Sequence, residues 1–132
     1  MNKKKFVVGW SIAVGLMDVL TGVLLMADPA LVLSTLGMAP LSSDALVFLS
    51  WVGVFVTGVG LSYAMALTDR RRGRTVWMVT ALMRALVAVF VAWRVADGSL
   101  VPMWAAVALT DAVVTVVQVG VLRSGWWQEP HR

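Results

Sequence analysis

The chain has 132 residues, of which 60% are hydrophobic and 14% are charged, and its formal net charge is +4. This composition is too apolar for a water-soluble domain of such length, so it favours a protein that resides in lipid. The sequence contains no cysteine, which excludes disulfide bonds and a catalytic thiol.

The first apolar run covers residues 6–27 and follows three lysines. A helix crosses the hydrocarbon layer in about 20 residues, so this run predicts a first membrane span. Small or polar residues recur along it at steps of three or four, the spacing that places them on one helix face. They are Ser11, Gly15, Asp18 and Gly22.

A short interfacial helix is predicted between the first two spans, over residues 29–37. Asp28 is able to cap free backbone N–H groups, and Pro29 suits the first helical position. Leucines follow until Gly37 ends the helix. We expect these leucines to lie against the bundle or the lipid.

Three more spans are predicted over residues 45–67, 75–95 and 100–122. Each carries its own stripe of small or polar residues, and the stripe of the third contains Arg84 and that of the fourth Asp111. The connections between these spans are short, which makes the spans antiparallel neighbours. The sequence therefore predicts an all-α, four-helix antiparallel transmembrane bundle that forms one domain over residues 1–132.

The termini and connections on one side of the predicted membrane carry most of the basic residues, and the connections on the other side carry acidic ones. Under the positive-inside rule, the basic segments are cytoplasmic. This predicts a multi-pass protein of the cytoplasmic (inner) membrane with both termini inside, and the arginines suit anionic lipid better than nucleic acid. The basic residues are Lys3, Lys4, Lys5, Arg70, Arg71, Arg72, Arg74, Arg123 and Arg132, and the opposite connections carry Asp28, Asp44 and Asp97.

Asp18, Arg84 and Asp111 fall at similar depths when each helical residue advances about 1.5 Å. A lone charge at this depth costs at least ~3 kcal/mol, so we expect the three to meet inside the bundle. Two acids face one base, so one aspartate is expected to hold a proton. Asp18 is favoured because its level matches Arg84 less well. A structural role, in which the ion pairs fix helix register, is weighed equally with a functional one.

Other polar residues have separate predicted roles. Asp28, Arg94 and Asp97 are expected to form a salt bridge at the outer boundary, where water is near. Tyr63, Thr115 and Gln118 are candidates for contact with a quinone or another ligand. No residue is predicted to be catalytic, and no metal ligands or resident cofactor are predicted. The seven tryptophans are expected to anchor the span ends at the membrane surfaces.

The chain resembles the small bacterial four-helix membrane proteins called DoxX-like. The resemblance rests on the glycine-rich second span, on Arg84 and Asp111, and on a first segment that runs from Gly15-Leu16-Met17-Asp18 to Gly22, then through Asp28-Pro29 to Leu36-Gly37. It covers nearly the whole length. It implies a four-helix bundle and, for some relatives, association with quinone-linked redox enzymes.

The leading functional hypothesis is a non-catalytic membrane subunit that packs in a larger complex, or with copies of itself, in contact with lipid. It rests on the absence of a nucleophile and base pair or a phosphate-binding loop from the sequence. The alternative is a small proton-coupled transporter that uses Asp18 and Asp111. An enzyme acting on a lipid is a third hypothesis, although the depth of the charges disfavours it.

Overall fold

The computed structural model describes residues 2–127 of the chain. Arg132, which was grouped with the cytoplasmic basic residues, lies outside the described residues. Regular structure in the described part is entirely helical. Four helical stretches are long and apolar enough to cross a membrane, and they coincide with the four predicted spans. They cover Lys3–Ala27, Ser43–Thr68, Arg71–Ala96 and Pro102–Arg123.

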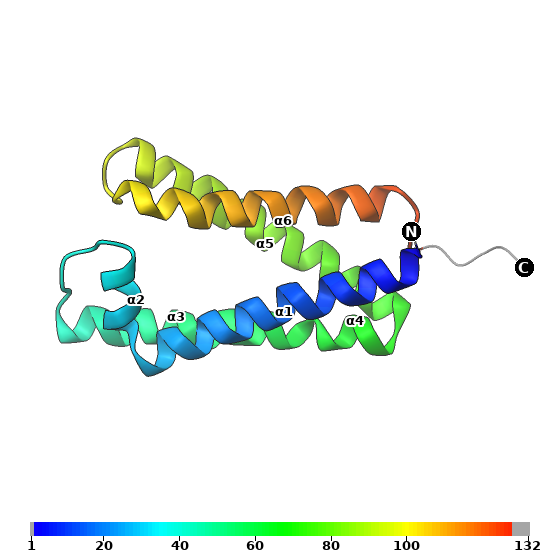
Figure 1. Cartoon of the computed structure of the whole chain (residues 1–132), viewed down its shortest axis with the longest axis horizontal. Helices are drawn as coiled ribbons and strands as arrows, with labels where there is room; N and C mark the ends of the chain where they lie inside the picture. The colour runs from blue at the N-terminus through cyan, green and yellow to red at the C-terminus, as the bar shows by residue number, and fades with distance from the viewer. Residues whose placement is uncertain (1, 128–132) are drawn as a thin grey trace, which may run out of the picture.

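The helices follow one another with short connections (Figure 1). A short helix occupies the position of the predicted interfacial helix, although it ends two residues earlier than expected. The elements are α1 (Lys3–Ala27), α2 (Pro29–Thr35), α3 (Ser43–Ser62), α4 (Ala64–Thr68), α5 (Arg70–Ala96), the 3₁₀ helix η1 (Pro102–Trp104) and α6 (Ala105–Arg123).

Side-chain caps fix where several of these helices begin. Asp28 accepts a hydrogen bond from the backbone N–H of Leu31 at 2.9 Å, and Pro29 takes the first position of α2, as predicted. Asp69 caps α5 in the same way through the N–H of Arg71, at 2.8 Å. Each carboxylate satisfies a backbone donor that the first helical turn leaves free.

The second predicted span is interrupted, which the hydropathy pattern did not reveal. α3 ends at Ser62, Tyr63 forms a turn, and α4 continues to Thr68. At the break the N–H of Tyr63 bonds the carbonyl of Gly60 at 3.2 Å, three residues earlier rather than four. The hydroxyl of Ser62 also bonds the carbonyl of Val59, at 2.6 Å, and such back-bonding bends helices.

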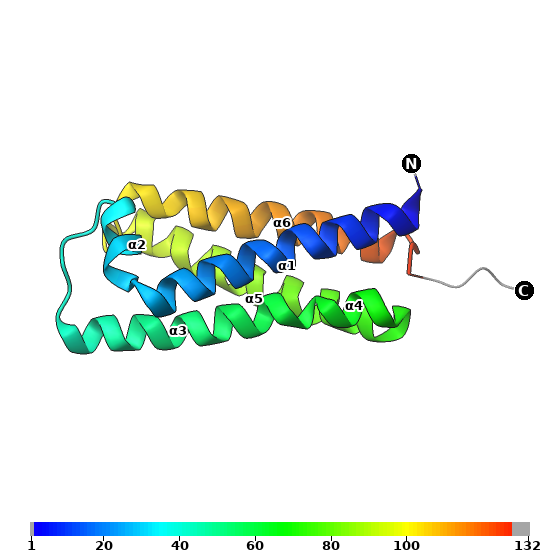
Figure 2. The same ribbon diagram turned by 60° about the horizontal axis from the view of Figure 1, so that its bottom comes forward.

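The long helices form two pairs. α1 packs along α3, and α5 packs along α6, while α4 links the pairs by packing on α5 and α1 (Figures 1 and 2). A side-chain contact also joins the pairs at one end, where Phe6 of α1 meets Trp126, just after α6, edge to face with ring centroids 5.4 Å apart. Within the second pair, Trp77 of α5 meets Trp127 in the same way at 5.4 Å.

Glycines bring α1 and α3 into close backbone contact. A Cβ atom built on Gly22 would lie 2.5 Å from the backbone nitrogen of Thr57 and 2.6 Å from the carbonyl oxygen of Gly53. A Cβ on Gly60 would lie 2.6 Å from the carbonyl oxygen of Gly15. Both distances are far below van der Waals contact, so only glycine fits. The predicted small-residue stripes of these two helices therefore face each other.

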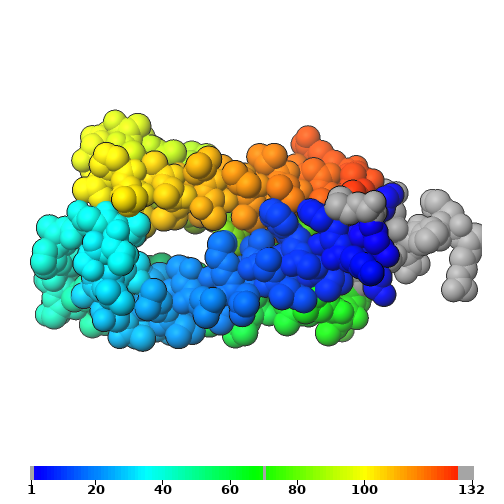
Figure 3. Space-filling model, in the orientation of Figure 1, coloured from blue at the N-terminus to red at the C-terminus, as the bar shows by residue number. Residues whose placement is uncertain are grey.

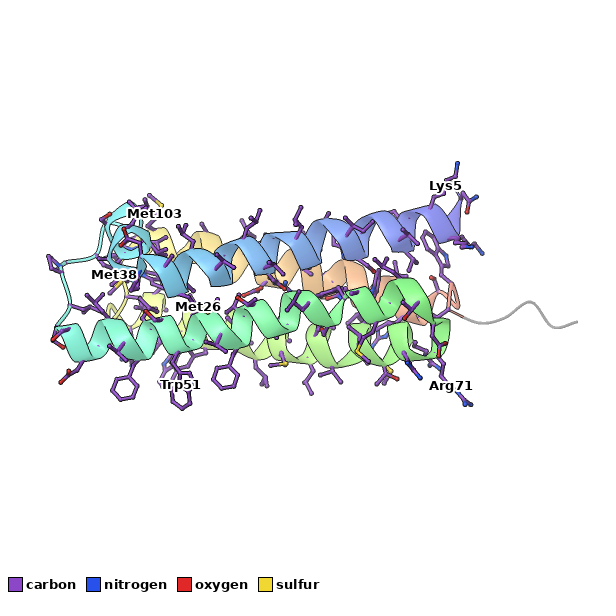
Figure 4. The ribbon with its side chains drawn as sticks, turned by 90° about the horizontal axis from the view of Figure 1, so that it is seen from below. Lys5, Met26, Met38, Trp51, Arg71 and Met103 are labelled. Carbon is purple, nitrogen blue, oxygen red and sulfur yellow. The ribbon has the colours of Figure 1, made fainter. Side chains whose placement is uncertain are left out.

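The two ends of the molecule differ in charge. The start of α1, the turn between α4 and α5, and the end of α6 lie together at what we call the basic end, where Figure 4 shows Lys5 and Arg71. α2, the start of α3 and the turn between α5 and α6 lie at the opposite, acidic end, which carries Asp28, Asp44 and Asp97.

Two tryptophans expected at the membrane surfaces are core residues instead. Trp77 is fully buried and Trp127 is 8% exposed, and both belong to the hydrophobic core near the basic end. Trp51 and Trp93 do face outward, with 59% and 60% of their surface exposed, and Figure 4 shows Trp51 pointing away from the helices. An indole ring buries a large apolar area, so it stabilises a helix contact as readily as it anchors a span end.

Candidate functional site

The three predicted interior charges meet in one place, which we call the charge cluster: Asp18 of α1, Arg84 of α5 and Asp111 of α6. Nη2 of Arg84 donates to both carboxylate oxygens of Asp18, at 2.6 and 2.5 Å. Nη1 donates to one oxygen of Asp111. The side chains are 8–13% exposed. One guanidinium thus ties three helices together through charge-assisted hydrogen bonds.

A neutral hydrogen-bond network lies beside the charge cluster. The hydroxyl of Tyr63 donates to the hydroxyl of Thr80 at 3.0 Å, and Nε2 of Gln118 donates to both hydroxyls, at 2.9 and 3.2 Å. Gln118 is fully buried and Tyr63 is 1% exposed. The network therefore joins α5 and α6 to the turn between α3 and α4. We call these three residues and the charge cluster together the polar centre.

A further buried hydrogen bond lies toward the basic end. The indole N–H of Trp77 donates to the hydroxyl of Ser11 at 2.9 Å, and neither side chain is exposed beyond 1%. This bond joins α5 to α1 without any charge. It satisfies a polar group that would otherwise be buried without a partner, which costs about 1–3 kcal/mol.

Two of the predicted ligand-contacting residues, Tyr63 and Gln118, are thus brought together, and the third is placed differently. Thr115 donates to the backbone carbonyl of Ala81 at 3.4 Å, so its hydroxyl serves the contact between α5 and α6. Thr80 was not singled out as a site residue. Its position in the sequence could have identified it, because Thr80 lies one helical turn before Arg84, a spacing that puts both side chains on one face.

The predicted salt bridge at the acidic end forms in part. Nη1 of Arg94 lies 2.9 Å from a carboxylate oxygen of Asp97, and both side chains are partly exposed. The hydrogen bonds from Ser99 and the charge of Arg94 hold the pKa of Asp97 below its ordinary value. Asp28 does not pair with Arg94 in the described structure. It caps α2 instead, because its carboxylate accepts from the backbone N–H of Leu31, which the first helical turn leaves free.

The chemistry available to the polar centre is narrow. Among residues 2–127, no three histidine, cysteine, aspartate or glutamate side chains are placed to hold a metal ion. The charge cluster offers two carboxylates and one guanidinium, and the neighbouring network offers hydroxyls and one amide. Such groups bind protons or hydrogen-bonding ligands, and they hold helices in register.

Two atoms of the polar centre are buried without a partner in the described structure: Nε of Arg84 and Oε1 of Gln118. Buried polar atoms are nearly always paired, so each marks a place for a water molecule or a ligand atom. A comparison of the chain with protein-family models, with characterised proteins and with solved structures finds no match.

Proposed function

We propose that this chain is a non-catalytic, multi-pass subunit of the bacterial inner membrane, an antiparallel bundle with both termini in the cytoplasm. In this proposal it associates with a partner membrane subunit or with copies of itself, as the DoxX-like resemblance also suggests. A quinone-linked complex is one such partner. The charge cluster then serves to hold the helices of the subunit together.

One observation supports this role above the others: apart from the face that contacts α1, α3 is largely exposed. In the most apolar stretch of Ser43–Thr68 only 11% of the residues are buried, against 28–33% in the corresponding stretches of the other three spans. Its aromatic side chains point outward, and Phe48, Trp51 and Phe55 are 59–65% exposed. Rings spaced at three and four residues form a continuous surface on one helix face, which suits packing against another helix.

Purification in a mild detergent, followed by native mass spectrometry, tests the proposal. We expect a complex larger than one chain, which the triple variant Phe48→Ala, Trp51→Ala, Phe55→Ala converts to the monomer. The matched control is Phe90→Ala with Trp93→Ala on α5, which also removes exposed rings and leaves the complex intact. A monomer from the unaltered chain, without any copurifying protein, would overturn the proposal.

The second candidate is a proton-coupled transporter that uses Asp18 and Asp111. It is favoured by the opening in Figure 3, because Asp18 and Asp111 belong to α1 and α6, the helices that border the opening, and a transport site must be reached from at least one side. Reconstituted vesicles with a pH-sensitive dye inside test it. Proton movement coupled to a solute and abolished in Asp18→Asn and Asp111→Asn supports transport, whereas vesicles that move no protons for any solute exclude it.

A further inference from the structure

An opening passes through the molecule between its two helix pairs (Figure 3). The C-terminal half of α1 and α2 border it on one side, and the N-terminal half of α6 borders it on the other. The pairs meet again at the acidic end, where the indole N–H of Trp104 lies 3.0 Å from the sulfur of Met38. The opening is therefore a lateral window. In the membrane orientation that we propose, it connects the space between the helix pairs to the bilayer.

The charge cluster is asymmetric beside this window. Both oxygens of Asp18 are held by Arg84, whereas within residues 2–127 only one oxygen of Asp111 receives a hydrogen bond. Asp111 also has the most exposed side chain of the three, at 13%. Its second oxygen accepts no hydrogen bond from residues 2–127.

The cluster also has one negative charge too many. The charged groups that face Asp111 are Arg84 from α5 and Asp18 from α1. The hydroxyl of Tyr63, from the turn between α3 and α4, belongs to the neighbouring network with Thr80 and Gln118. Arg84 compensates one carboxylate only. An uncompensated carboxylate in a medium of low dielectric constant takes up a proton. The proton must reach an oxygen that is not already held by the guanidinium.

We propose that Asp111 is a proton-binding site, and that its free oxygen exchanges the proton through the lateral window. The protonated Asp111 then stands beside a neutral pair of Asp18 and Arg84. This assignment replaces the sequence-based expectation that favoured Asp18. It does not depend on the proposed subunit role, because the charge imbalance exists whether the chain acts alone or in a complex.

A lipid-soluble carbodiimide tests the proposal on the unaltered chain in vesicles. It adds to a protonated carboxyl in an apolar setting and rearranges to a stable N-acylurea without loss of atoms, which peptide mass spectrometry locates. We expect the adduct on Asp111, with a yield that increases as the pH falls from about 8 to about 5, because only the protonated carboxyl reacts. An adduct on Asp18 instead, or on neither residue, would overturn the proposal.

Two variants sharpen the result. Asp111→Asn should lose the adduct at this position without transferring it to Asp18, because the remaining Asp18 is neutralised by Arg84. Asp18→Asn should also lose it, because Arg84 then neutralises the ionised Asp111. If Asp18→Asn instead keeps the full yield of adduct on Asp111, charge imbalance is not the cause and the proposal fails. Native mass spectrometry of both variants checks the subunit role separately.

Discussion

Arg84 joins three helices through one guanidinium group. The loss of stability on its removal differs from the net stabilisation that its ion pairs contribute. Replacement by an apolar residue leaves the carboxylate of Asp18 buried without a compensating charge. Breaking a buried pair in this way is strongly destabilising, whereas replacing all of its members by neutral groups is often tolerated. The distinction separates a cluster that fixes helix packing from one whose charges are needed for another reason.

Arg84→Met should therefore lower the free energy of unfolding by about 3–5 kcal/mol. The triple variant Asp18→Asn, Arg84→Met, Asp111→Asn should recover most of that loss. Unfolding in mixed micelles with increasing sodium dodecyl sulfate measures both. The control is Arg94→Met at the partly exposed pair, which should change stability by less than about 1 kcal/mol. Equal effects of the two arginine substitutions would contradict the assignment.

Asp97 lies outside the spans, where its charge is exposed to water. Its pKa is held below the ordinary value first by the Ser99 side chain, then by the Ser99 backbone N–H and by Arg94. A carboxyl whose pKa is lower in the folded state stabilises the turn above its unfolded pKa. This contribution is lost as the pH falls through the folded pKa.

Ser99→Ala should raise the pKa of Asp97 toward its ordinary value, because one of the hydrogen bonds to the carboxylate is removed. The backbone N–H, 2.9 Å from the carboxylate, remains and keeps part of the shift. Carbon-detected NMR titration of Asp97 in micelles measures the change. Ser124→Ala at the basic end is the control and should leave the Asp97 titration unaltered.

The residues of the charge cluster were identified from the sequence, but the partners within it were assigned less well. Counting residues along each helix gave similar depths for Asp18, Arg84 and Asp111, and all three do meet. The same counting ranked Asp18 as the poorer partner, although Arg84 holds both of its oxygens. Depth along a helix says nothing of its tilt or of the reach of an arginine side chain, and these decide which oxygen is bound.

α1 and α3 are held together by backbone contact across glycines, which is how helices pack where lipid supplies no hydrophobic driving force. The contact requires Gly22, Gly53 and Gly60 to lack a Cβ atom. Gly58 lies on α3, as Gly53 and Gly60 do, but it faces outward, and nothing lies within 4 Å of the position of its Cβ. The chain thus contains a matched pair of glycines for testing this contact.

Gly22→Ala should destabilise the protein by about 1–3 kcal/mol, because the added methyl group meets the backbone of α3. Gly58→Ala should be neutral, or should stabilise α3 by up to about 1 kcal/mol through better helix propensity. Circular dichroism during detergent unfolding follows both variants. If the two substitutions change stability equally, the close contact between α1 and α3 does not stabilise the protein as we expect.

The excess of basic residues at one end of the molecule favours one orientation in a membrane. Lys5 and Arg71 lie at the same end of the structure, although they are far apart in the sequence (Figure 4). Positive residues are retained on the cytoplasmic side during insertion. The basic end is therefore expected to face the cytoplasm.

Single cysteines can test this orientation without background, because the natural chain has none. Ala39→Cys, in the exposed connection at the acidic end, should react with a membrane-impermeant maleimide in intact cells. Ser124→Cys, exposed at the basic end, should react only after the membrane is permeabilised. The reverse pattern, or labelling of both positions in intact cells, would contradict a single orientation with both termini inside.

The sequence by itself determined the four apolar helices, several of their caps, the charge at each end and the residues of the charge cluster. These features depend on local composition, on spacing along one helix and on neighbouring backbone donors, all of which can be read directly. Only the tertiary structure decided that α1 pairs with α3 and α5 with α6, that Trp77 is buried, and that a window separates the pairs. Those outcomes depend on how each helix tilts and rotates and on how far its side chains reach toward segments that are distant in the chain. The spacing of residues along one helix does not determine these quantities.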